Sequence, residues 1–532
     1  MSHLFLTGFM GAGKSTVGRI VAERLGRPFM DLDALIEERE AASVAEIFRL
    51  RGEEGFRLAE HDALAALGAS ADAVIATGGG VILREDNRVM LRQLGTVIYL
   101  AVTPEEAIAR LGDAADRPLL AGAGFPAARA ILDARLTLYT STADHVVDTV
   151  GREAAEVAAD VIAAIGPASA PQTIRVTGEA GTSYEIVVGH DILDSLGERI
   201  APFTTSRTIA LISDETVFGL FGDRARASLV QAGCTVTTHV VPPGEESKSW
   251  ATAGRLLEEL AAAGIDRTSC VVALGGGVVG DLAGFCASAY MRGIPVVQVP
   301  TTLLAQVDSA IGGKTGVNLP AAKNMLGTFY QPRGVFIDLA FLDTLPDREF
   351  ANGLAEIVKY GVIEDPELLK YLADEAEAIR GRDGAILERL VARSCRIKKG
   401  IVELDETEKG LRRILNFGHT MGHAVEAATD YGMAHGEAVA VGMVAAARIS
   451  VALDHLSADE GERIEAVLRA VGLPVRIPGD VSAERLLDGL RMDKKKEGAD
   501  VHFVLLKKIG IPFVNGAVPE ALLRKTIEDL QS

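Results

Sequence analysis

Three of the chain's ten histidines lie within one segment of 22 residues, NFGHTMGHAVEAATDYGMAHGE at positions 416–437. His419 and His423 are four residues apart, so on a helix they would share one face. His435 follows a turn marked by Gly432. Neutral imidazoles that converge in this way are preferred zinc ligands. A solvated helical face would explain one such histidine, whereas three at this spacing indicate a metal site.

A second pattern, GFMGAGKS at residues 8–15, has the full G-x-x-x-x-G-K-S spacing and precedes the helical stretch TVGRIVAERL. Backbone N–H groups of such a loop hold phosphate oxygens. Lys14 would reach the β- and γ-phosphates, and Ser15 would hold Mg²⁺. The loop has no accompanying NKxD-like element for guanine, so ATP is the expected nucleotide. A glycine-rich turn without a ligand is the alternative. The expected ATP-binding residues are Gly11, Ala12, Gly13, Lys14, Ser15 and Thr16.

A kinase also needs an acceptor site, and the acids of DLD are candidates for it. Asp31 and Asp33 follow the strand-like RPFM and would lie at the phosphate end of a parallel sheet. Solvated loop acids are the structural alternative. Four further features accompany them: FRLAE with Arg57 and Glu60, TGGG at Gly78–Gly80, Arg117 and Arg135. With these features, residues 1–165 resemble shikimate kinase.

The resemblance implies a role for each of these residues. Asp33 would orient and deprotonate the acceptor hydroxyl of shikimate, and Arg57 and Arg135 would bind its carboxylate through their planar guanidinium groups. Arg117 would close with a lid, contact ATP and stabilise charge on the transferring phosphoryl group, while the closed lid excludes water. The backbone would approach the ring of shikimate at Gly78, Gly79 and Gly80.

The rest of the chain contains a glycine run, GGGVVGD, after the strand-like CVVAL. The run allows close approach of a dinucleotide pyrophosphate, but it lacks the G-x-G-x-x-G spacing and alone fits a tight turn equally well. Other polar segments follow or precede it: PPGEESKS, PTTLLAQVDS, GGKTGVN, GLAEIVKYG, RRILNFGHTMGH and HGE. In order and spacing, these segments resemble 3-dehydroquinate synthase over residues 172–532.

This second resemblance implies cofactors and binding residues. Glu356, His419 and His435 would hold Zn²⁺, with Co²⁺ as the alternative metal, and would leave a position open for substrate. His423, which spacing alone would make a ligand, would instead lie beside the substrate phosphate. Catalysis would involve Lys314, Lys359, Arg412, Asn416 and His423. NAD⁺ would be bound by Asp214, Glu245, Lys248, Gly276, Gly277, Val278, Asp281, Thr301, Thr302, Lys314, Lys323, Phe341 and Thr344. The substrate 3-deoxy-D-arabino-heptulosonate 7-phosphate (DAHP) would be bound by Arg292, Asp308, Lys314, Asn324, Lys359, Arg412, Asn416, His423 and one of Lys494 and Lys495.

The implied reaction converts linear DAHP into a carbocycle. Metal coordination acidifies a substrate hydroxyl, a hydride passes to NAD⁺, phosphate leaves, the hydride returns and the ring closes. The chain is thus expected to be a bifunctional enzyme of aromatic biosynthesis, although its two steps are not consecutive. A polyol dehydrogenase, which would release NADH, is the alternative for the second half. A nucleotide-sensing regulator is another alternative, but it would need neither a base such as Asp33 nor an open zinc position.

The elements that must position these residues follow two patterns. Residues 1–165 alternate strand-like and helical stretches, which predicts a P-loop kinase domain with a parallel sheet. Residues 166–172, GPASAPQ, form a linker without apolar periodicity. Residues 173–337 continue the α/β alternation, which predicts a Rossmann-like NAD-binding domain. Residues 338–532 are almost wholly helical and are expected to form the metal- and substrate-binding domain.

Composition restricts the partners. The net charge of −19 argues against a surface for nucleic acid or anionic lipid, so small-molecule substrates are expected, and a homodimer through the synthase half is compatible with the second resemblance. The four cysteines show no CxxC spacing, as expected for reduced thiols in a cytoplasmic protein. The chain has no signal-like start and no long apolar run.

Overall fold

In the computed structural model, the chain forms two compact units, Met1–Ala170 and Pro171–Ser532. The structure describes residues 3–69, 72–111, 124–165, 171–178, 183–319, 322–408, 410–430, 432–479, 481–497, 502–515 and 518–531. Among these residues, no helix has the length and apolar character that crossing a membrane would require.

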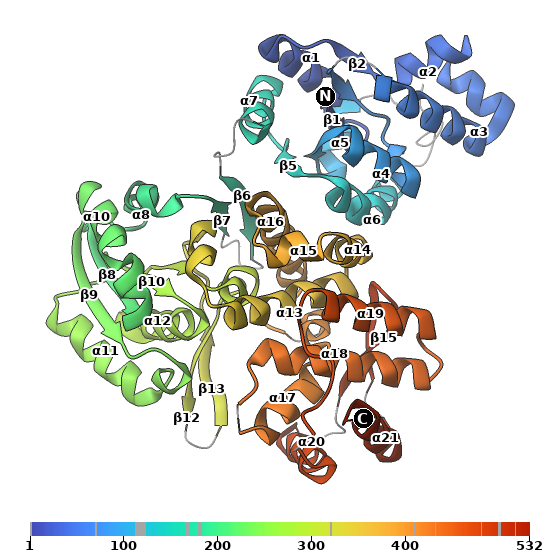
Figure 1. Ribbon diagram of the computed structural model, residues 1–532. Coiled ribbons are helices and arrows are strands. Elements are labelled where there is room, and N and C mark those ends of the chain that lie inside the picture. The colour runs from blue at the N-terminus through green and yellow to red at the C-terminus, as the bar shows by residue number, and fades with distance from the viewer. Residues whose placement is uncertain are drawn as a thin grey trace. The chain divides into compact units, whose positions relative to one another are not determined.

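The first unit is a five-stranded parallel sheet with helices between successive strands (Figure 1). The strand order is β2-β3-β1-β4-β5. Strands β1 and β3 are buried along their whole length, as expected when helices cover both faces of a parallel sheet. The strands are β1 (His3–Thr7), β2 (Phe29–Asp31), β3 (Val74–Ala76), β4 (Gly95–Ala101) and β5 (His145–Asp148). The helices are α1 (Lys14–Leu25), α2 (Leu32–Glu40), α3 (Val44–Ala66), α4 (Glu85–Leu94), α5 (Pro104–Leu111), α6 (Gly124–Thr142) and α7 (Ala154–Ile165).

Local sequence signals explain where the helices of the first unit begin and bend. Helix α3 begins with a capping box, because the Ser43 side chain accepts from the Glu46 backbone while Glu46 accepts from the Ser43 backbone. Gly52, with φ 69°, then separates α3 into two parts. The second part carries the predicted shikimate-binding Arg57 and, three residues later, Glu60.

The second unit begins with a seven-stranded sheet of order β6-β7-β14-β11-β10-β8-β9, in which only the β6–β7 pair is antiparallel. Strand β10 is buried on both faces. Val271 and Ala273 contact the core beneath α11 and α12, and Val272 and Leu274 contact the core beneath α8 and α10. The strands are β6 (Gln172–Thr177), β7 (Ser183–Gly189), β8 (Thr208–Asp214), β9 (Thr235–Val241), β10 (Cys270–Gly275), β11 (Val296–Pro300) and β14 (Gly334–Asp338). The helices are α8 (Leu196–Ile200), α9 (Glu215–Val217), α10 (Asp223–Gln231), α11 (Trp250–Ala262) and α12 (Gly277–Ala289).

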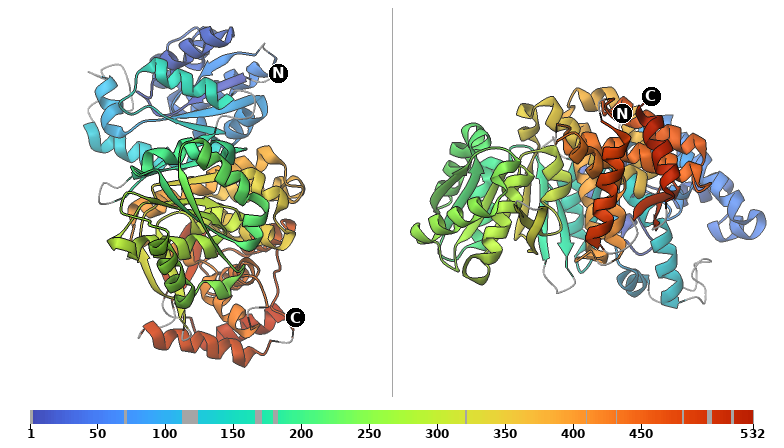
Figure 2. Two further views of the ribbon diagram at one scale, coloured as in Figure 1. Left: turned by 90° about the vertical axis from the view of Figure 1, so that its left-hand side faces the viewer. Right: turned by 90° about the horizontal axis from the view of Figure 1, so that it is seen from below.

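A helical lobe completes the second unit, and it lies beside the sheet lobe in Figures 1 and 2. The hairpin of β12 (Lys314–Leu319) and β13 (Ala322–Phe329) precedes this lobe, and the hairpin of β15 (Phe503–Lys508) and β16 (Ile511–Asn515) lies within it. The alanine-rich α18 is almost wholly buried. The predicted fold class is confirmed. The helices are α13 (Asp347–Ile363), α14 (Pro366–Asp374), α15 (Ala376–Arg380), α16 (Gly384–Leu404), α17 (His419–Ala428), α18 (His435–Ala452), α19 (Ala458–Ala470), α20 (Ala483–Glu497) and α21 (Glu520–Gln531).

Candidate active sites

The phosphate loop between β1 and α1 is held in shape by glycine and by its own lysine. Gly11 has φ 80°, and a Cβ there would lie 2.5 Å from the Ala107 carbonyl oxygen, so only glycine fits. Lys14 Nζ donates to the carbonyl oxygens of Gly8 (2.8 Å) and Phe9 (2.9 Å). The lysine therefore lies along the loop that would hold the phosphates.

Ser15 and Asp31 form the oxygen ligands of a candidate magnesium site. Ser15 Oγ donates to Asp31 Oδ2 at 2.7 Å, and Asp31 Oδ1 caps α2 by accepting from the Asp33 backbone N–H at 3.1 Å. Hard oxygen donors beside a phosphate loop suit Mg²⁺. Sequence reasoning assigned the metal to Ser15 alone, and the contact with Asp31 adds a carboxylate.

The predicted carboxylate-binding Arg57 is buried and held by two acids. Its Nη1 donates to Glu60 Oε2 at 2.8 Å, and its Nη2 donates to Glu53 Oε1 at 3.3 Å. Glu60 is fully buried, and this burial raises the pKa of its carboxyl although the Arg57 cation opposes the shift. A Cβ at Gly80 would lie 2.3 Å from both Arg57 Nη atoms, so the guanidinium lies directly against the glycine segment.

The other acceptor-site residues meet the same segment. A Cβ at Gly78 would lie 2.8 Å from Asp33 Oδ1. Arg135 Nη1 donates to the Gly79 carbonyl at 3.1 Å, and the Tyr139 hydroxyl donates to the same oxygen. The structure therefore brings together Asp33, Arg57, Arg135 and the TGGG backbone. Arg117 lies outside the described residues.

In the second unit, a cavity of about 1080 Å³ lies where β8, β10, β11 and β14 end, between the sheet and the helical lobe. Carboxyl ends of parallel strands are where dinucleotides bind in such sheets. Every predicted NAD-binding residue except Lys314 lines it: Asp214, Glu245, Lys248, Gly276, Gly277, Val278, Asp281, Thr301, Thr302, Lys323, Phe341 and Thr344.

Lys248 organises one wall of this cavity. Its Nζ donates to Asp281 Oδ2 (2.5 Å) and to Asn324 Oδ1 (2.6 Å). Burial raises the pKa of Asp281 although the Lys248 cation opposes the shift. Asn324, a predicted substrate residue, is thus joined to two predicted NAD residues.

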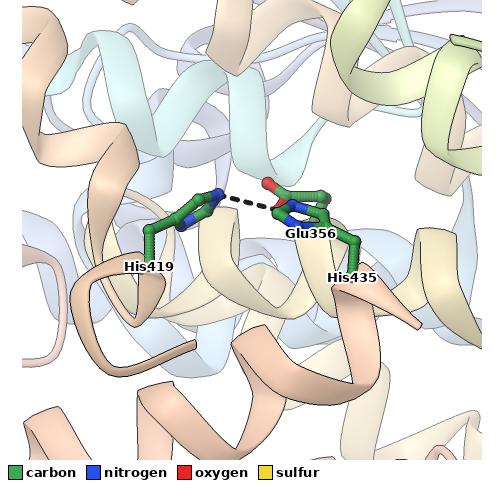
Figure 3. Close-up of side chains that lie close together, drawn as sticks. All are labelled: Glu356, His419 and His435. Atoms are coloured by element: carbon green, nitrogen blue, oxygen red, sulfur yellow. Dashed lines mark ion pairs between the residues drawn. The ribbon is translucent and has the colours of Figure 1, made fainter. Parts of the chain in front are cut away.

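Three side chains from three helices converge in the helical lobe (Figure 3), and one of them, His435, lines the cavity. Glu356 comes from α13, His419 opens α17 and His435 opens α18. Glu356 Oε1 lies 3.5 Å from His419 Nε2 and 3.8 Å from His435 Nε2. This oxygen is buried and has no hydrogen-bond partner among the described residues. An orphaned carboxylate oxygen facing two imidazole nitrogens fits a zinc-type cation.

Each histidine of this cluster is oriented through its other ring nitrogen. His419 Nδ1 lies 3.2 Å from the Phe417 carbonyl oxygen, and His435 Nδ1 lies 3.4 Å from Glu426 Oε2. Such contacts favour a proton on Nδ1 and leave Nε2 to bind metal. Sequence reasoning missed Glu426, and its only signal was the helical spacing from His423.

Burial and neighbouring charges shift the pKa values of the three residues in this cluster. Burial lowers the pKa of His419 to about 3, which keeps this imidazole neutral. For His435, burial alone would lower the pKa, but the carboxylates of Glu356 and Glu426 raise it to about 10. For Glu356, burial opposes ionisation, but the Lys359 cation and the neighbouring His435 imidazole outweigh it and lower the pKa to about 2.

A buried polar network continues from this cluster toward Asp308. The Lys359 ammonium donates to Glu356, and Lys398 Nζ donates to the carbonyl oxygen and Oδ1 of Asp308, both at 2.6 Å. The Tyr360 hydroxyl also donates to Asp308 Oδ1, at 2.9 Å. Sequence reasoning missed Lys398, because a KK pair in a helix resembles a solvated face.

The other residues predicted to bind substrate differ in how far they are buried. His423 is exposed and lines the cavity, whereas Arg412 is buried and donates to the Glu406 carbonyl at 2.7 Å. Asn416 is exposed at the end of the 3₁₀ turn Leu411–Asn416. Lys494 and Lys495 lie in α20, and their side chains are outside the described set.

Lys314 and Arg292 do not line the cavity, and neither do Lys359, Arg412 and Asn416. Lys314 Nζ instead pairs with Glu408. Arg292 is exposed in the turn that joins α12 to the start of β11. Because α12 runs from the carboxyl end of β10 to the amino end of β11, Arg292 lies at the edge of the sheet opposite the cavity of its own chain.

A phosphate loop beside an acceptor pocket, and a dinucleotide-sized cavity beside a carboxylate–histidine cluster, define an enzyme with two active centres. Residues 10–166 match the family model of shikimate kinase. Residues 238–352 and 353–496 match the amino-terminal and carboxyl-terminal models of 3-dehydroquinate synthase. A 3-dehydroquinate synthase from Pelotomaculum thermopropionicum is 50% identical over 343 residues, covering 64% of this chain and 92% of the relative.

Two solved structures are similar to the second unit. The structure of 2-deoxy-scyllo-inosose synthase complexed with carbaglucose-6-phosphate, NAD⁺ and Co²⁺ has 28% identity and a TM-score of 0.63, covering 67% of this chain and 100% of that one. The structure of 2-epi-5-epi-valiolone synthase from Streptomyces hygroscopicus with NAD⁺ and Zn²⁺ bound has 31% identity and a TM-score of 0.61, covering 67% and 99%.

The chain belongs to the 3-dehydroquinate synthase family through its second unit, and its first unit is of the shikimate kinase family. The predictions of two families and of two enzyme activities are therefore confirmed. The chain is a bifunctional enzyme of the shikimate pathway.

Proposed function

We propose that the second unit converts DAHP into 3-dehydroquinate and phosphate, and that the first unit phosphorylates shikimate with ATP to give shikimate 3-phosphate. The observation that carries the first assignment is the convergence of Glu356, His419 and His435 beside the cavity that collects the predicted NAD residues. The convergence of Arg57, Arg135 and Asp33 on the TGGG segment supports the second.

Glu356, His419 and His435 are the residues that would hold Zn²⁺ or Co²⁺, and the cavity residues would hold NAD⁺. When bound, the cation acidifies a substrate hydroxyl and the nicotinamide takes and returns a hydride. We assign His423 to the substrate phosphate, because its exposed ring lies 5.4 Å from the His419 ring and faces the same cavity. Asp308 lines the cavity and pairs with the buried Lys398, and we assign this pair and the buried Lys359 to the hydroxyls and carboxylate of DAHP.

In the first unit, the chain's residues bind and orient two anions. Lys14 and the loop N–H groups would hold the ATP phosphates, and Ser15 with Asp31 would hold Mg²⁺. Arg57 and Arg135 would bind the shikimate carboxylate, leaving Asp33 to accept the proton of the attacking hydroxyl. The partners we assign are small molecules, and we propose 173–337 and 338–532 as the NAD-binding and metal-binding parts of the synthase. A homodimer through the synthase and a cytoplasmic location complete the proposal.

A different synthase activity is the second candidate, because the two solved neighbours of the second unit are synthases of other names. The identity of 50% to a 3-dehydroquinate synthase favours DAHP. A polyol dehydrogenase would release NADH continuously, so steady absorbance growth at the NADH band would exclude the proposed reaction, in which the hydride returns.

Two assays on the full chain test the proposal: DAHP-dependent phosphate release with and without a chelator, and shikimate-dependent ADP formation. We expect Lys14→Ala to abolish ADP formation alone, because it removes the phosphate-binding cation of the first unit. His435→Ala should abolish phosphate release alone. If either substitution silenced both activities, two independent sites would be the wrong description.

A further inference from the structure

A second group of metal-ligand residues lies beside the first and shares one histidine with it. His423, Glu426 and His435 offer ligand atoms that all lie within 4.8 Å of one another, as do those of Glu356, His419 and His435. We name these the outer triad (His423, Glu426, His435) and the inner triad (Glu356, His419, His435). All three outer residues line the cavity.

The two triads use opposite nitrogens of the same imidazole. His435 Nε2 faces Glu356 Oε1 at 3.8 Å, and His435 Nδ1 faces Glu426 Oε2 at 3.4 Å. A neutral imidazole carries a proton on one nitrogen and a lone pair on the other. His435 can therefore complete only one triad at a time, which makes the two positions alternatives.

The triads differ in access from the cavity. Glu356 is fully buried, and the His419 side chain is 14% exposed, whereas His423 is exposed. The side chain of His435, which both triads share, is 31% exposed. A cation that arrives through the cavity meets the outer triad before it reaches Glu356.

Resting on the metal site of the proposed function, we propose that the outer triad is a separate holding position through which a divalent first-row cation is loaded. Two imidazoles and one carboxylate select Zn²⁺ or Co²⁺ over Mg²⁺ and Ca²⁺, which prefer oxygen ligands. The cation first binds His423, Glu426 and His435 Nδ1, while the His435 proton resides on Nε2. On transfer, cation and proton exchange nitrogens: the cation takes Nε2 and the proton takes Nδ1, where Glu426 accepts its hydrogen bond.

The holding position also has a cost for the reaction. A cation held there occupies His423 and Glu426 in the cavity wall, so it competes with substrate for this part of the cavity. Bound DAHP should therefore favour the cation in the inner triad over the outer one.

Equilibrium binding of Co²⁺ to the full chain, followed by visible absorption, tests the proposal without turnover. The candidate magnesium site of the first unit offers only oxygen ligands, which produce a much weaker band than imidazole ligands in a low-coordinate site. We expect wild type and the matched control His190→Ala, which changes an exposed histidine of the same unit, to bind one such Co²⁺. His419→Ala destroys the inner triad and should still bind one Co²⁺ with a shifted spectrum. Adding His423→Ala to it should abolish this binding.

Glu356→Gln provides a second way to remove the inner triad, should His419→Ala unfold, and thermal unfolding of each variant checks folding. Stopped-flow absorption adds the kinetic arm: His423→Ala alone should slow the capture of Co²⁺ but reach the wild-type final spectrum. Residual binding that survives the double substitution would overturn the outer triad, and so would a complete loss of binding in both folded inner-triad variants. A wild type that binds no Co²⁺ through histidine would instead remove the metal site of the proposed function, and the inference with it.

Discussion

Replacing Gly80 with alanine should weaken shikimate binding, and the geometry of the structure gives the expected size of the effect. The added Cβ would lie 2.3 Å from both Nη atoms of Arg57 and 2.4 Å from its Cζ, distances at which the guanidinium must move. Gly80 has φ −113°, a conformation open to alanine, so the change acts on Arg57 and not on the backbone. Arg57 cannot simply swing aside, because Glu60 and Glu53 hold its two Nη atoms.

The size of the effect follows from the contact that is lost. A hydrogen bond to a charged group contributes about 1.5–3 kcal/mol, and about 1.4 kcal/mol corresponds to a tenfold change. Displacing Arg57 from the shikimate carboxylate should therefore raise the KM for shikimate about 10- to 150-fold. The KM for ATP should stay near the wild-type value, because the phosphate loop is untouched.

The assay is shikimate-dependent ADP formation, with DAHP-dependent phosphate release as an internal control on the same chain. Gly68→Ala is the matched variant, since its Cβ would meet only Leu94 Cδ2 at an ordinary 3.4 Å. A folded Gly80→Ala protein with an unchanged KM for shikimate would refute the assignment of Arg57 to the carboxylate. An equal loss of ATP affinity would show that the substitution had disturbed the whole unit.

Three further predictions concern the second unit and the thiols. Gly442→Ala should lower the free energy of unfolding by about 1–3 kcal/mol and weaken Co²⁺ binding, because the added Cβ would lie 1.9 Å from the Gly418 carbonyl oxygen and force α17 away from α18. Denaturant unfolding measures the first effect and Co²⁺ titration the second. An unchanged stability would contradict the close packing of the two helices. Lys398→Met should lower the free energy of unfolding in urea by about 3–5 kcal/mol, because it removes the buried cationic partner of the Asp308 carboxylate. It should also raise the pKa of Asp308, which is low in wild type. The contribution of this carboxylate is lost as the pH falls from its unfolded pKa toward its folded pKa, so the difference in stability between wild type and variant should become smaller on acidification. Burial raises the pKa of three thiols to about 12, so alkylation of these three in the folded protein should stay slow up to about pH 10 and become fast only on unfolding. Mass spectrometry can follow the labelling at each cysteine, and rapid labelling of these three in the native protein would show that they are accessible. The three are Cys270, Cys286 and Cys395.

The sequence was sufficient wherever function depends on neighbours along the chain. The phosphate loop is one contiguous strand–loop–helix, so spacing alone predicts that Lys14 and Ser15 lie in it. The alternation of apolar strands and helices likewise predicted two parallel sheets and a helical carboxyl-terminal lobe, because backbone hydrogen bonding and burial impose those periods locally. Family resemblance extended this reading to residues far apart, such as Arg57 and Arg135.

Tertiary structure alone decided which charges are buried together and which nitrogen of a histidine faces which carboxylate. In the sequence, Lys398 cannot be told from a solvent-exposed helical lysine, but in the structure α16 buries it against Asp308. Glu426 follows His423 by three residues, yet its contact is with His435 on another helix. Lys314 pairs with Glu408, and Arg292 lies at the opposite sheet edge, for reasons that no local pattern contains. Desolvation and Coulomb energy depend on distances between elements, and those distances arise only when helices such as α17 and α18 pack through glycines at close range.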